Sequence, residues 1–322
     1  MIAQSPRRHA LLLHPYLLLT LVALFWASNV VLGRGIAGRI PPVTLNTLRW
    51  AIALAILLPI AWSQLAGNGR IIRAHVWRLV LLAVPSVAIY NTFIYLGTRT
   101  TTAANAGLIV GAMPIAILAL AALLGQERVT IRRAFGVVAS FLGVMCVITK
   151  GDIAIVRHLS FSTGDLWIVG SMLSWAIYSV LLRRFALPLG AFALLAVISA
   201  IGLALCIPFC AWELASGQQI EWSLGTVAAI LYVGIFPAAV ATIFWNQAIA
   251  RVGAGTAGIF TNLIPVFAVL MAVTLLGESL ERFQLVGMAL IFTGIWLATG
   301  KALPLQKLLA SAVDTQRKVQ EG

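Results

Sequence analysis

Two pairs of residues with the chemistry to bind a solute lie inside long apolar segments of the sequence. Trp26 with Asn29, and Trp175 with Tyr178, are each three residues apart, so each pair occupies one face of a helix. A polar group in a membrane-spanning helix is costly when it faces lipid, so these faces should point into a helix bundle. Aromatic rings beside amide and hydroxyl groups suit a neutral or zwitterionic solute with an apolar side chain.

Residues that could perform covalent or metal chemistry are not arranged to do so. The four histidines lie at or beyond the ends of the apolar segments, and the sequence has no H-E-x-x-H motif, no G-x-S-x-G motif and no pair of intramembrane aspartates. Cys146, Cys206 and Cys210 lie in apolar runs without C-x-x-C spacing, which favours core or lipid-facing positions over metal or redox roles. We therefore expect no catalytic residue, no metal site and no cofactor, and a protein that is not an enzyme.

Charged residues are sparse inside the apolar segments. Glu127, Asp165 and Glu278 all map to segment ends, which argues against an exporter of organic cations and against a proton antiporter with a carboxylate relay. Arg49 is the one embedded cation. We favour snorkelling or a hydrogen bond to a neighbouring carbonyl for its guanidinium, and attraction of a substrate carboxylate is the alternative.

The bulk composition requires lipid as the solvent. Apolar residues make up 61% of the 322 residues and charged residues only 10%, with a mean hydropathy of +1.01. The net charge of +13 does not indicate nucleic-acid binding, because the basic residues fall in short gaps between apolar runs. The first apolar run resembles a signal peptide but continues to Leu32 without an A-x-A cleavage site. At about 20 apolar residues per span, the sequence predicts ten transmembrane helices, at residues 14–33, 44–63, 76–97, 102–124, 133–149, 164–182, 190–213, 223–247, 255–276 and 283–300.

The sequence also contains an internal repeat. Pro114 matches Pro265 at an offset of 151 residues, and Trp26 matches Trp175 at an offset of 149. The chain is thus a duplicated five-helix unit, and an odd number of spans makes the second copy enter the membrane from the opposite side. Basic residues are concentrated in the loops that are cytoplasmic if the N-terminus is inside. We expect a cytoplasmic N-terminus (1–13), a first repeat (14–149), a periplasmic linker (150–163), a second repeat (164–300) and a cytoplasmic tail (301–322).

These features resemble the drug/metabolite transporter superfamily, in its EamA-type branch of ten-helix exporters. The resemblance covers residues 14–300 and rests on residues 25–29 (FWASN), 48–49 (LR), 100–127 and 252–278. Within the superfamily the chain looks most like bacterial amino-acid exporters, including exporters of aromatic amino acids. The resemblance implies a central cavity lined mainly by the third, fourth, eighth and ninth helices, with the first and sixth contributing, and open alternately to either side.

Those six helices carry polar and aromatic residues that we expect to bind the substrate. They are Trp26, Asn29, Ser86, Tyr90, Asn91, Tyr95, Asn105, Trp175, Tyr178, Thr242, Trp245, Asn246 and Asn262. In the alternative interpretation, the asparagines hold helices together and the aromatic rings form an interfacial belt. For the set as a whole we favour the cavity.

Four prolines lie inside the helices that the resemblance assigns to the cavity. Pro85, Pro114, Pro237 and Pro265 fall in the third, fourth, eighth and ninth helices. Each removes one backbone hydrogen bond and favours a kink. We therefore expect hinges at these positions.

Together these patterns predict an all-α integral membrane protein of ten helices, built as two inverted five-helix repeats around a central cavity. Such repeats are typical of transporters that work by alternating access. We expect a secondary transporter of the bacterial inner membrane, functional as a monomer, that exports small neutral or zwitterionic metabolites, above all amino acids. Its partners would be lipid and a small-molecule substrate, without nucleic acid. Alternatives are an exporter of another metabolite or drug, a channel, and a non-transporting sensor, although no selectivity filter is visible in the sequence.

Overall fold

The computed structural model describes residues 14–35, 38–152, 154–155, 160–276 and 279–300. Throughout these ranges the regular structure is helical. Nine of the described helices are long and apolar enough to cross a membrane, and Pro15–Val30 is a shorter apolar helix. This confirms the predicted all-helical fold of ten spans. The predicted termini, residues 1–13 and 301–322, and Glu278 lie outside the described residues.

The helices follow the predicted spans closely. In the first half they are α1 (Pro15–Gly35), α2 (Pro42–Gly67), the short α3 (Gly69–Ala74), α4 (Val76–Ala83), η1 (Val84–Ile89), α5 (Tyr90–Gly97), α6 (Ala103–Gly111), α7 (Met113–Leu123) and α8 (Ile131–Ile148). In the second half they are α10 (Thr163–Phe185), α11 (Ala191–Ala215), α12 (Leu224–Val233), η2 (Gly234–Val240), α13 (Ala241–Val252), α14 (Ala254–Ile259), η3 (Phe260–Asn262), α15 (Leu263–Leu276) and α16 (Arg282–Thr299). The sixth span runs three residues beyond the predicted end, and the eighth runs five residues beyond it.

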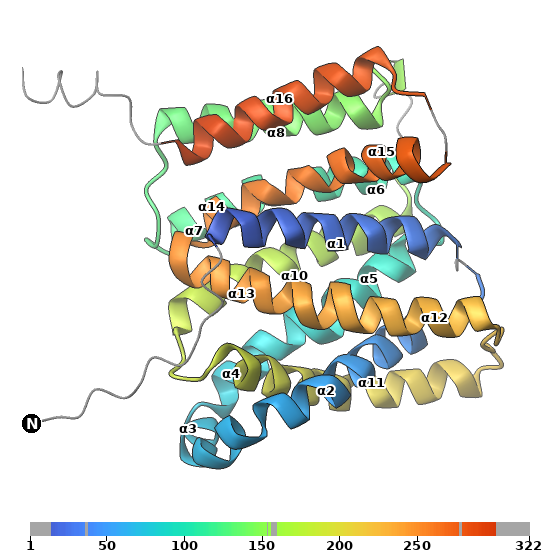
Figure 1. Ribbon diagram of the computed structural model, residues 1–322. Helices are drawn as coiled ribbons and strands as arrows, with labels where there is room; N and C mark the ends of the chain where they lie inside the picture. The colour runs from blue at the N-terminus through green and yellow to red at the C-terminus, as the bar shows by residue number, and fades with distance from the viewer. Residues whose placement is uncertain (1–13, 36–37, 153, 156–159, 277–278, 301–322) are drawn as a thin grey trace, which may run out of the picture.

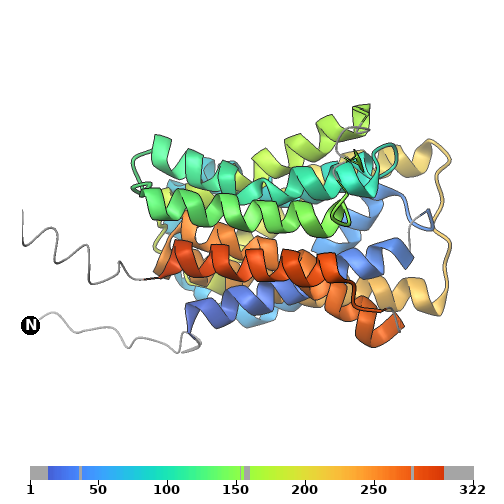
Figure 2. The same ribbon diagram turned by 90° about the horizontal axis from the view of Figure 1, so that it is seen from above.

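The two halves of the chain interlock. The helices in contact include α2 with α11, α5 with α10, α1 with α13, and α8 with α16, and each of these pairs joins the first half to the second. Figures 1 and 2 show α8 and α16 side by side at one edge of the bundle, and Figure 1 shows α2 and α11 at the opposite edge. In the repeat, α1 corresponds to α10 and α5 corresponds to α13. The contact of α1 with α13 is therefore the counterpart of the contact of α10 with α5. The halves therefore share one core.

Glycines let α8 and α16 touch through their backbones. A Cβ on Gly136 would lie 2.6 Å from the carbonyl oxygen of Gly294, and a Cβ on Gly143 would lie 2.6 Å from that of Gly287. Because the higher number on one helix meets the lower number on the other, the two helices run antiparallel. Close approach through small residues is the usual way that helices associate in lipid, where burial of apolar surface gives no driving force.

The four predicted hinge prolines all lie where the helical hydrogen-bond pattern changes. Pro85 and Pro237 lie in the two π-helical segments η1 and η2. Pro114 follows the break between α6 and α7, and Pro265 follows the 3₁₀ turn η3. Proline removes one amide hydrogen and clashes with the preceding turn, so the backbone widens or breaks there. Whether the chain bends at these points during function stays a prediction.

Candidate substrate-binding cavity

A cavity of about 640 Å³ lies between α1, α2, α5, α6, α8, η3 and α15, and Ile168 of α10 also contributes to its wall. It extends from Trp26 and Asn262, in the middle of the bundle, to Gly38 and Thr98 in the α1–α2 and α5–α6 connections. We call the end of the bundle with the α1–α2 and α5–α6 connections the α1–α2 end. The opposite end, which carries the α7–α8 and α13–α14 connections, is called the α7–α8 end. Since Gly38 and Thr98 are exposed, the cavity opens toward the α1–α2 end.

The structure brings some of the predicted binding residues together on the cavity wall and places the others elsewhere. Those that line it are Trp26, Asn29, Tyr90, Asn91, Tyr95 and Asn262. Those outside it are Ser86, Asn105, Trp175, Tyr178, Thr242, Trp245 and Asn246. The eighth span, expected to contribute strongly, does not line the cavity, whereas α2 and α8 do. The binding role of each residue stays a prediction.

Five aromatic residues form a layer beneath the cavity, which we call the aromatic layer: Trp26, Tyr90, Trp175, Tyr178 and Trp245. Trp175 is its centre, with ring centroids 5.1 Å from Trp26, 4.6 Å from Tyr90, 5.1 Å from Tyr178 and 5.8 Å from Trp245. Trp175, Tyr178 and Trp245 are at most 2% exposed. The three rings of the layer that do not line the cavity are therefore closed to solvent.

The aromatic layer holds polar groups as well as rings. Trp26 Nε1 donates to the backbone carbonyl of Pro237 in η2 at 3.2 Å, and the Tyr178 hydroxyl donates to Asn246 Oδ1 at 2.6 Å. Among the described residues, no acceptor faces Trp175 Nε1, Trp245 Nε1 or Asn246 Nδ2. Buried donors without a partner are costly, so the packing of the aromatic layer must offset this cost.

Asn105 has a partner of its own at the α1–α2 end. Its Nδ2 donates to Asp165 Oδ2 at 3.0 Å and to the carbonyl of Ser160 at 2.9 Å. The Asp165 carboxylate also accepts from the Thr101 hydroxyl and from the Ser162 amide. Asp165 lies in the first turn of α10 and beside the first turn of α6, where the helix dipoles stabilise a negative charge. Asn105 thus ties two helix ends together.

Arg49 lies two turns inside α2 with its side chain in the cavity wall. It is 3% exposed, and its Nη1 donates to Asn91 Oδ1 at 2.8 Å and to the Tyr95 hydroxyl at 3.3 Å. The sequence favoured snorkelling or a carbonyl partner, but the partners found are side chains of α5. Those neutral oxygens hold the guanidinium in the cavity wall.

The cavity wall is otherwise neutral except at its mouth. Arg99 is exposed there and donates to Gln218 Oε1 at 2.8 Å. Among the described residues that line the cavity there is no aspartate and no glutamate. The field inside is therefore positive.

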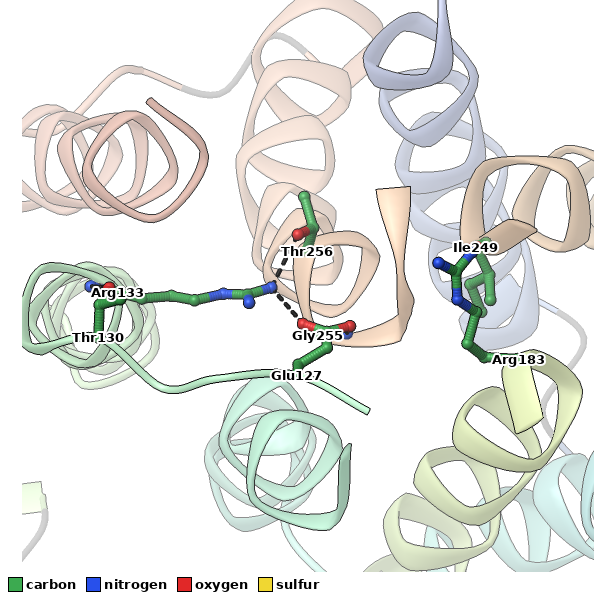
Figure 3. Close-up of polar contacts among 7 residues, drawn as sticks. All are labelled: Glu127, Thr130, Arg133, Arg183, Ile249, Gly255 and Thr256. Atoms are coloured by element: carbon green, nitrogen blue, oxygen red, sulfur yellow. Dashed lines mark hydrogen bonds and ion pairs between the residues drawn. The ribbon is translucent and has the colours of Figure 1, made fainter. Parts of the chain in front are cut away.

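Four residues that the sequence did not single out as a group join the two halves at the α7–α8 end. We call Glu127, Arg133, Gly255 and Thr256 the Glu127 cluster. Glu127 Oε2 lies 2.6 Å from Arg133 Nη2, Glu127 Oε1 accepts from the Gly255 amide at 2.9 Å, and Arg133 Nη2 donates to the Thr256 hydroxyl at 2.7 Å. Figure 3 shows Arg133 extending from α8 to α14, with Glu127 on the α7–α8 connection beside it.

Glycine makes the Glu127 cluster possible. Gly253 has φ of 88°, a left-handed conformation that side chains rarely adopt. A Cβ on Gly255 would lie 2.7 Å from Glu127 Oε2, so only glycine lets the carboxylate reach the α14 amide. Nearby, Arg183 Nη1 donates to the carbonyl of Ala250 at 2.6 Å, which adds a second link to the end of α13. In the sequence, the repetition of Glu127 as Glu278 and the glycines Gly253 and Gly255 were the features that could have indicated this cluster.

Glu213 is a buried carboxylate that sequence reasoning missed. It lies near the end of α11, is 3% exposed, and accepts from the Thr44 amide at 2.7 Å and the Thr44 hydroxyl at 2.8 Å. The Val43 amide donates to it at 3.2 Å. The first amides of a helix have no partner within the helix, so Glu213 caps α2 and has a structural role.

Comparisons with known proteins agree with this architecture. The model of the EamA-like transporter family matches residues 14–149 and 162–300. A Bacillus subtilis protein named uncharacterized transporter YyaM is 27% identical over 294 residues, which cover 89% of this chain and 94% of that protein. An uncharacterized transporter of Archaeoglobus fulgidus is 27% identical over 289 residues, covering 89% of this chain and 97% of that protein. A crystal structure with 23% sequence identity matches with a TM-score of 0.73, covering 88% of this chain and 96% of that one, and shows the same fold.

The apolar helices of the described chain, several of which enclose a cavity, define together with these relatives a multi-pass membrane transporter. The chain belongs to the EamA-like transporter family, whose model matches both halves of the sequence.

Proposed function

We propose that the protein exports small neutral or zwitterionic metabolites, amino acids including aromatic ones, across the inner membrane of a bacterium. The cavity carries this proposal. Its volume of about 640 Å³ falls within the roughly 300–1,000 Å³ typical of small-molecule sites. Amide and hydroxyl groups such as Asn91 and Tyr95 can bind the polar part of an amino acid, and Ile94 and Val110 can contact its side chain. A cavity wall without carboxylates disfavours organic cations.

We propose that transport occurs by alternating access between two inverted repeats. The antiparallel crossing of α8 and α16 and the exchange-equivalent contacts of α1 and α10 support two halves of opposite orientation. In the observed conformation the cavity opens toward the α1–α2 end, while the aromatic layer and the Glu127 cluster close the path toward the α7–α8 end. In the second conformation the opposite mouth opens, with hinges at the four deformed prolines.

The distribution of arginines supports an orientation in the membrane. Arg128, Arg133 and Arg183 are at or near the α7–α8 end, whereas Arg39 and Arg99 are at the other. Because positive residues are retained on the cytoplasmic side, the α7–α8 end faces the cytoplasm, and so do both chain termini. The observed cavity is then open to the periplasm. We propose that one copy of the chain is sufficient for transport, since a single chain encloses the cavity.

Counterflow in liposomes tests the proposal. Purified protein in vesicles preloaded with unlabelled phenylalanine or leucine is expected to accumulate the labelled amino acid, saturably, above the level of empty vesicles. A carrier exchanges solute in this way, whereas a channel does not. If every amino acid behaves as in empty vesicles while another metabolite is exchanged, the amino-acid assignment is wrong and the carrier assignment stands.

A further inference from the structure

Arg49 is a buried cation without a counter-charge. A guanidinium cannot be deprotonated in a protein, so the positive charge persists although the residue is only 3% exposed. In the described part of the chain the one salt bridge is that of Arg133 with Glu127, so no described carboxylate lies within 4.0 Å of Arg49. Buried charges in proteins are normally paired. The wall of this cavity thus contains a positive charge whose partner is not part of the described chain.

The neighbours of Arg49 have hydrogen-bond donors that no described residue uses. Asn91 Oδ1 and the Tyr95 oxygen both accept from Arg49 Nη1. The Asn91 amide group and the Tyr95 hydroxyl hydrogen are therefore free to donate, whereas Arg49 Nε is buried from solvent and has no acceptor among the described residues. All three residues line the cavity. Several donors around one positive charge form a site for an anion.

The shape of the site favours a carboxylate. Arg49 Nη1 already donates to Asn91 and Tyr95, which leaves Nη2 to pair with one oxygen of a carboxylate while the Asn91 amide and the Tyr95 hydroxyl can donate to the other. Apolar side chains of Ile94, Val110 and Ile264 line the rest of the cavity. A substrate with a carboxylate at one end and an apolar group at the other meets both surfaces.

We infer that Arg49, Asn91 and Tyr95 form the carboxylate subsite of the cavity, and that a carboxylate is required for a solute to bind. This inference rests on the proposed function and narrows it, because amino acids and other monocarboxylates satisfy the requirement whereas the corresponding amines and amides do not. Arg49 determines specificity by charge, and the apolar wall accepts the side chain.

Ligand-dependent thermal stabilisation of the purified protein in detergent tests the subsite. The ligands are phenylalanine, 3-phenylpropionate, 3-phenylpropanamide and phenylethylamine, which share one ring and differ in charge, and the aliphatic set built on leucine. A ligand that binds only the folded state raises the melting temperature, and the shift grows with the logarithm of the ligand concentration divided by its Kd. We expect stabilisation by the acid and the zwitterion of at least one set, and none by the amide or amine.

Variants assign the effect to the subsite. Arg49→Gln is expected to weaken carboxylate binding by about 10- to 100-fold, the range for hydrogen bonds to charged groups. Arg49→Lys keeps the charge without the guanidinium and should lose less. Tyr95→Phe removes one donor with little change in shape, so it tests the subsite even if Arg49→Gln fails to fold. Arg73→Gln removes an exposed arginine of α3 and should leave binding unchanged.

The possible outcomes separate the subsite from transport. Stabilisation by the amine or amide as strong as by the acid overturns the subsite, as does a wild-type protein that no carboxylate stabilises. Full carboxylate affinity in Arg49→Gln, or in Tyr95→Phe if the former does not fold, overturns it as well. A carboxylate that binds but is not exchanged in liposomes defeats the proposed transport and leaves the subsite intact. Exchange of a solute without a carboxylate defeats the subsite and leaves the carrier intact.

Discussion

Replacing Glu127 by glutamine is expected to open the α7–α8 end of the protein. The variant keeps an oxygen for the Gly255 amide but loses the ion pair with Arg133. Interactions with charged groups contribute about 1.5–3 kcal/mol, so the conformation open at this end should gain about 10- to 100-fold in population. The reporter is Ala257→Cys, a position buried in α14, with the three native cysteines replaced by serine. Its labelling by an impermeant thiol reagent, applied at the α7–α8 end, should accelerate by the same factor.

Two further variants control this experiment. Glu221→Gln removes an exposed carboxylate from the α11–α12 connection at the opposite end, and should leave the labelling rate unchanged. Arg133→Gln should accelerate labelling as Glu127→Gln does, and the double variant should add little, because the residues act as one pair. Equal labelling rates in Glu127→Gln and the unsubstituted reporter would show that the Glu127 cluster does not hold this end closed.

Replacing Trp175 by alanine is expected to cost more stability than any surface substitution. Its ring contacts Trp26, Tyr90, Tyr178 and Trp245, and it is 2% exposed. Truncating a buried tryptophan typically costs about 3–5 kcal/mol, because the surrounding side chains refill the space only in part. The melting temperature should fall markedly, and counterflow of the transported solute should drop at least about 10-fold as the separation between the two ends is lost.

The matched control for Trp175 is Trp222, which is 65% exposed in the α11–α12 connection. Trp222→Ala removes the same side chain without opening a space in the aromatic layer, so both measurements should stay near those of the unchanged protein. Trp175→Phe retains a ring and should lie between them. If the two alanine variants behave alike, the aromatic layer has no part in separating the cavity from the α7–α8 end.

The number and order of the helices could be predicted from the sequence because lipid imposes a length on every span. The effect of each proline on its helix could not be predicted from the sequence. Pro59 and Pro208 lie inside the continuous helices α2 and α11, whereas Pro85 and Pro237 lie in π-helical segments. Whether the chain absorbs a proline by bending or by widening depends on the neighbours that satisfy the freed carbonyl. At Pro237 the carbonyl of the proline itself accepts from Trp26 Nε1, which belongs to the other half of the chain.

The candidate site shows the same limit. Spacing placed Trp26 and Trp175 on interior faces, and in the structure their rings meet edge to face with centroids 5.1 Å apart. The partner of Asn105 could not be predicted from residue spacing. Asp165 is 60 residues away in the sequence, and it contacts Asn105 because α6 and α10 begin at the same end of the bundle. Glu213 was missed because its partner, Thr44, is also far away in the sequence. The chain has only nine acidic residues, so an acidic residue at the end of an apolar segment could have been noticed as unusual. The sequence predicts where along a span a residue lies. Which residue it contacts depends on how the two halves pack together.

Distances across the two ends of the bundle, measured in liposomes, test the account most directly. Spin labels at Arg39 and Asp152 report on the α1–α2 end, and labels at Val129 and Ala250 report on the α7–α8 end, all exposed positions. When a transported solute is added, the populations should shift so that one distance shortens as the other lengthens. Two distances that change together, or that stay fixed while the solute is exchanged, would contradict alternating access through this cavity.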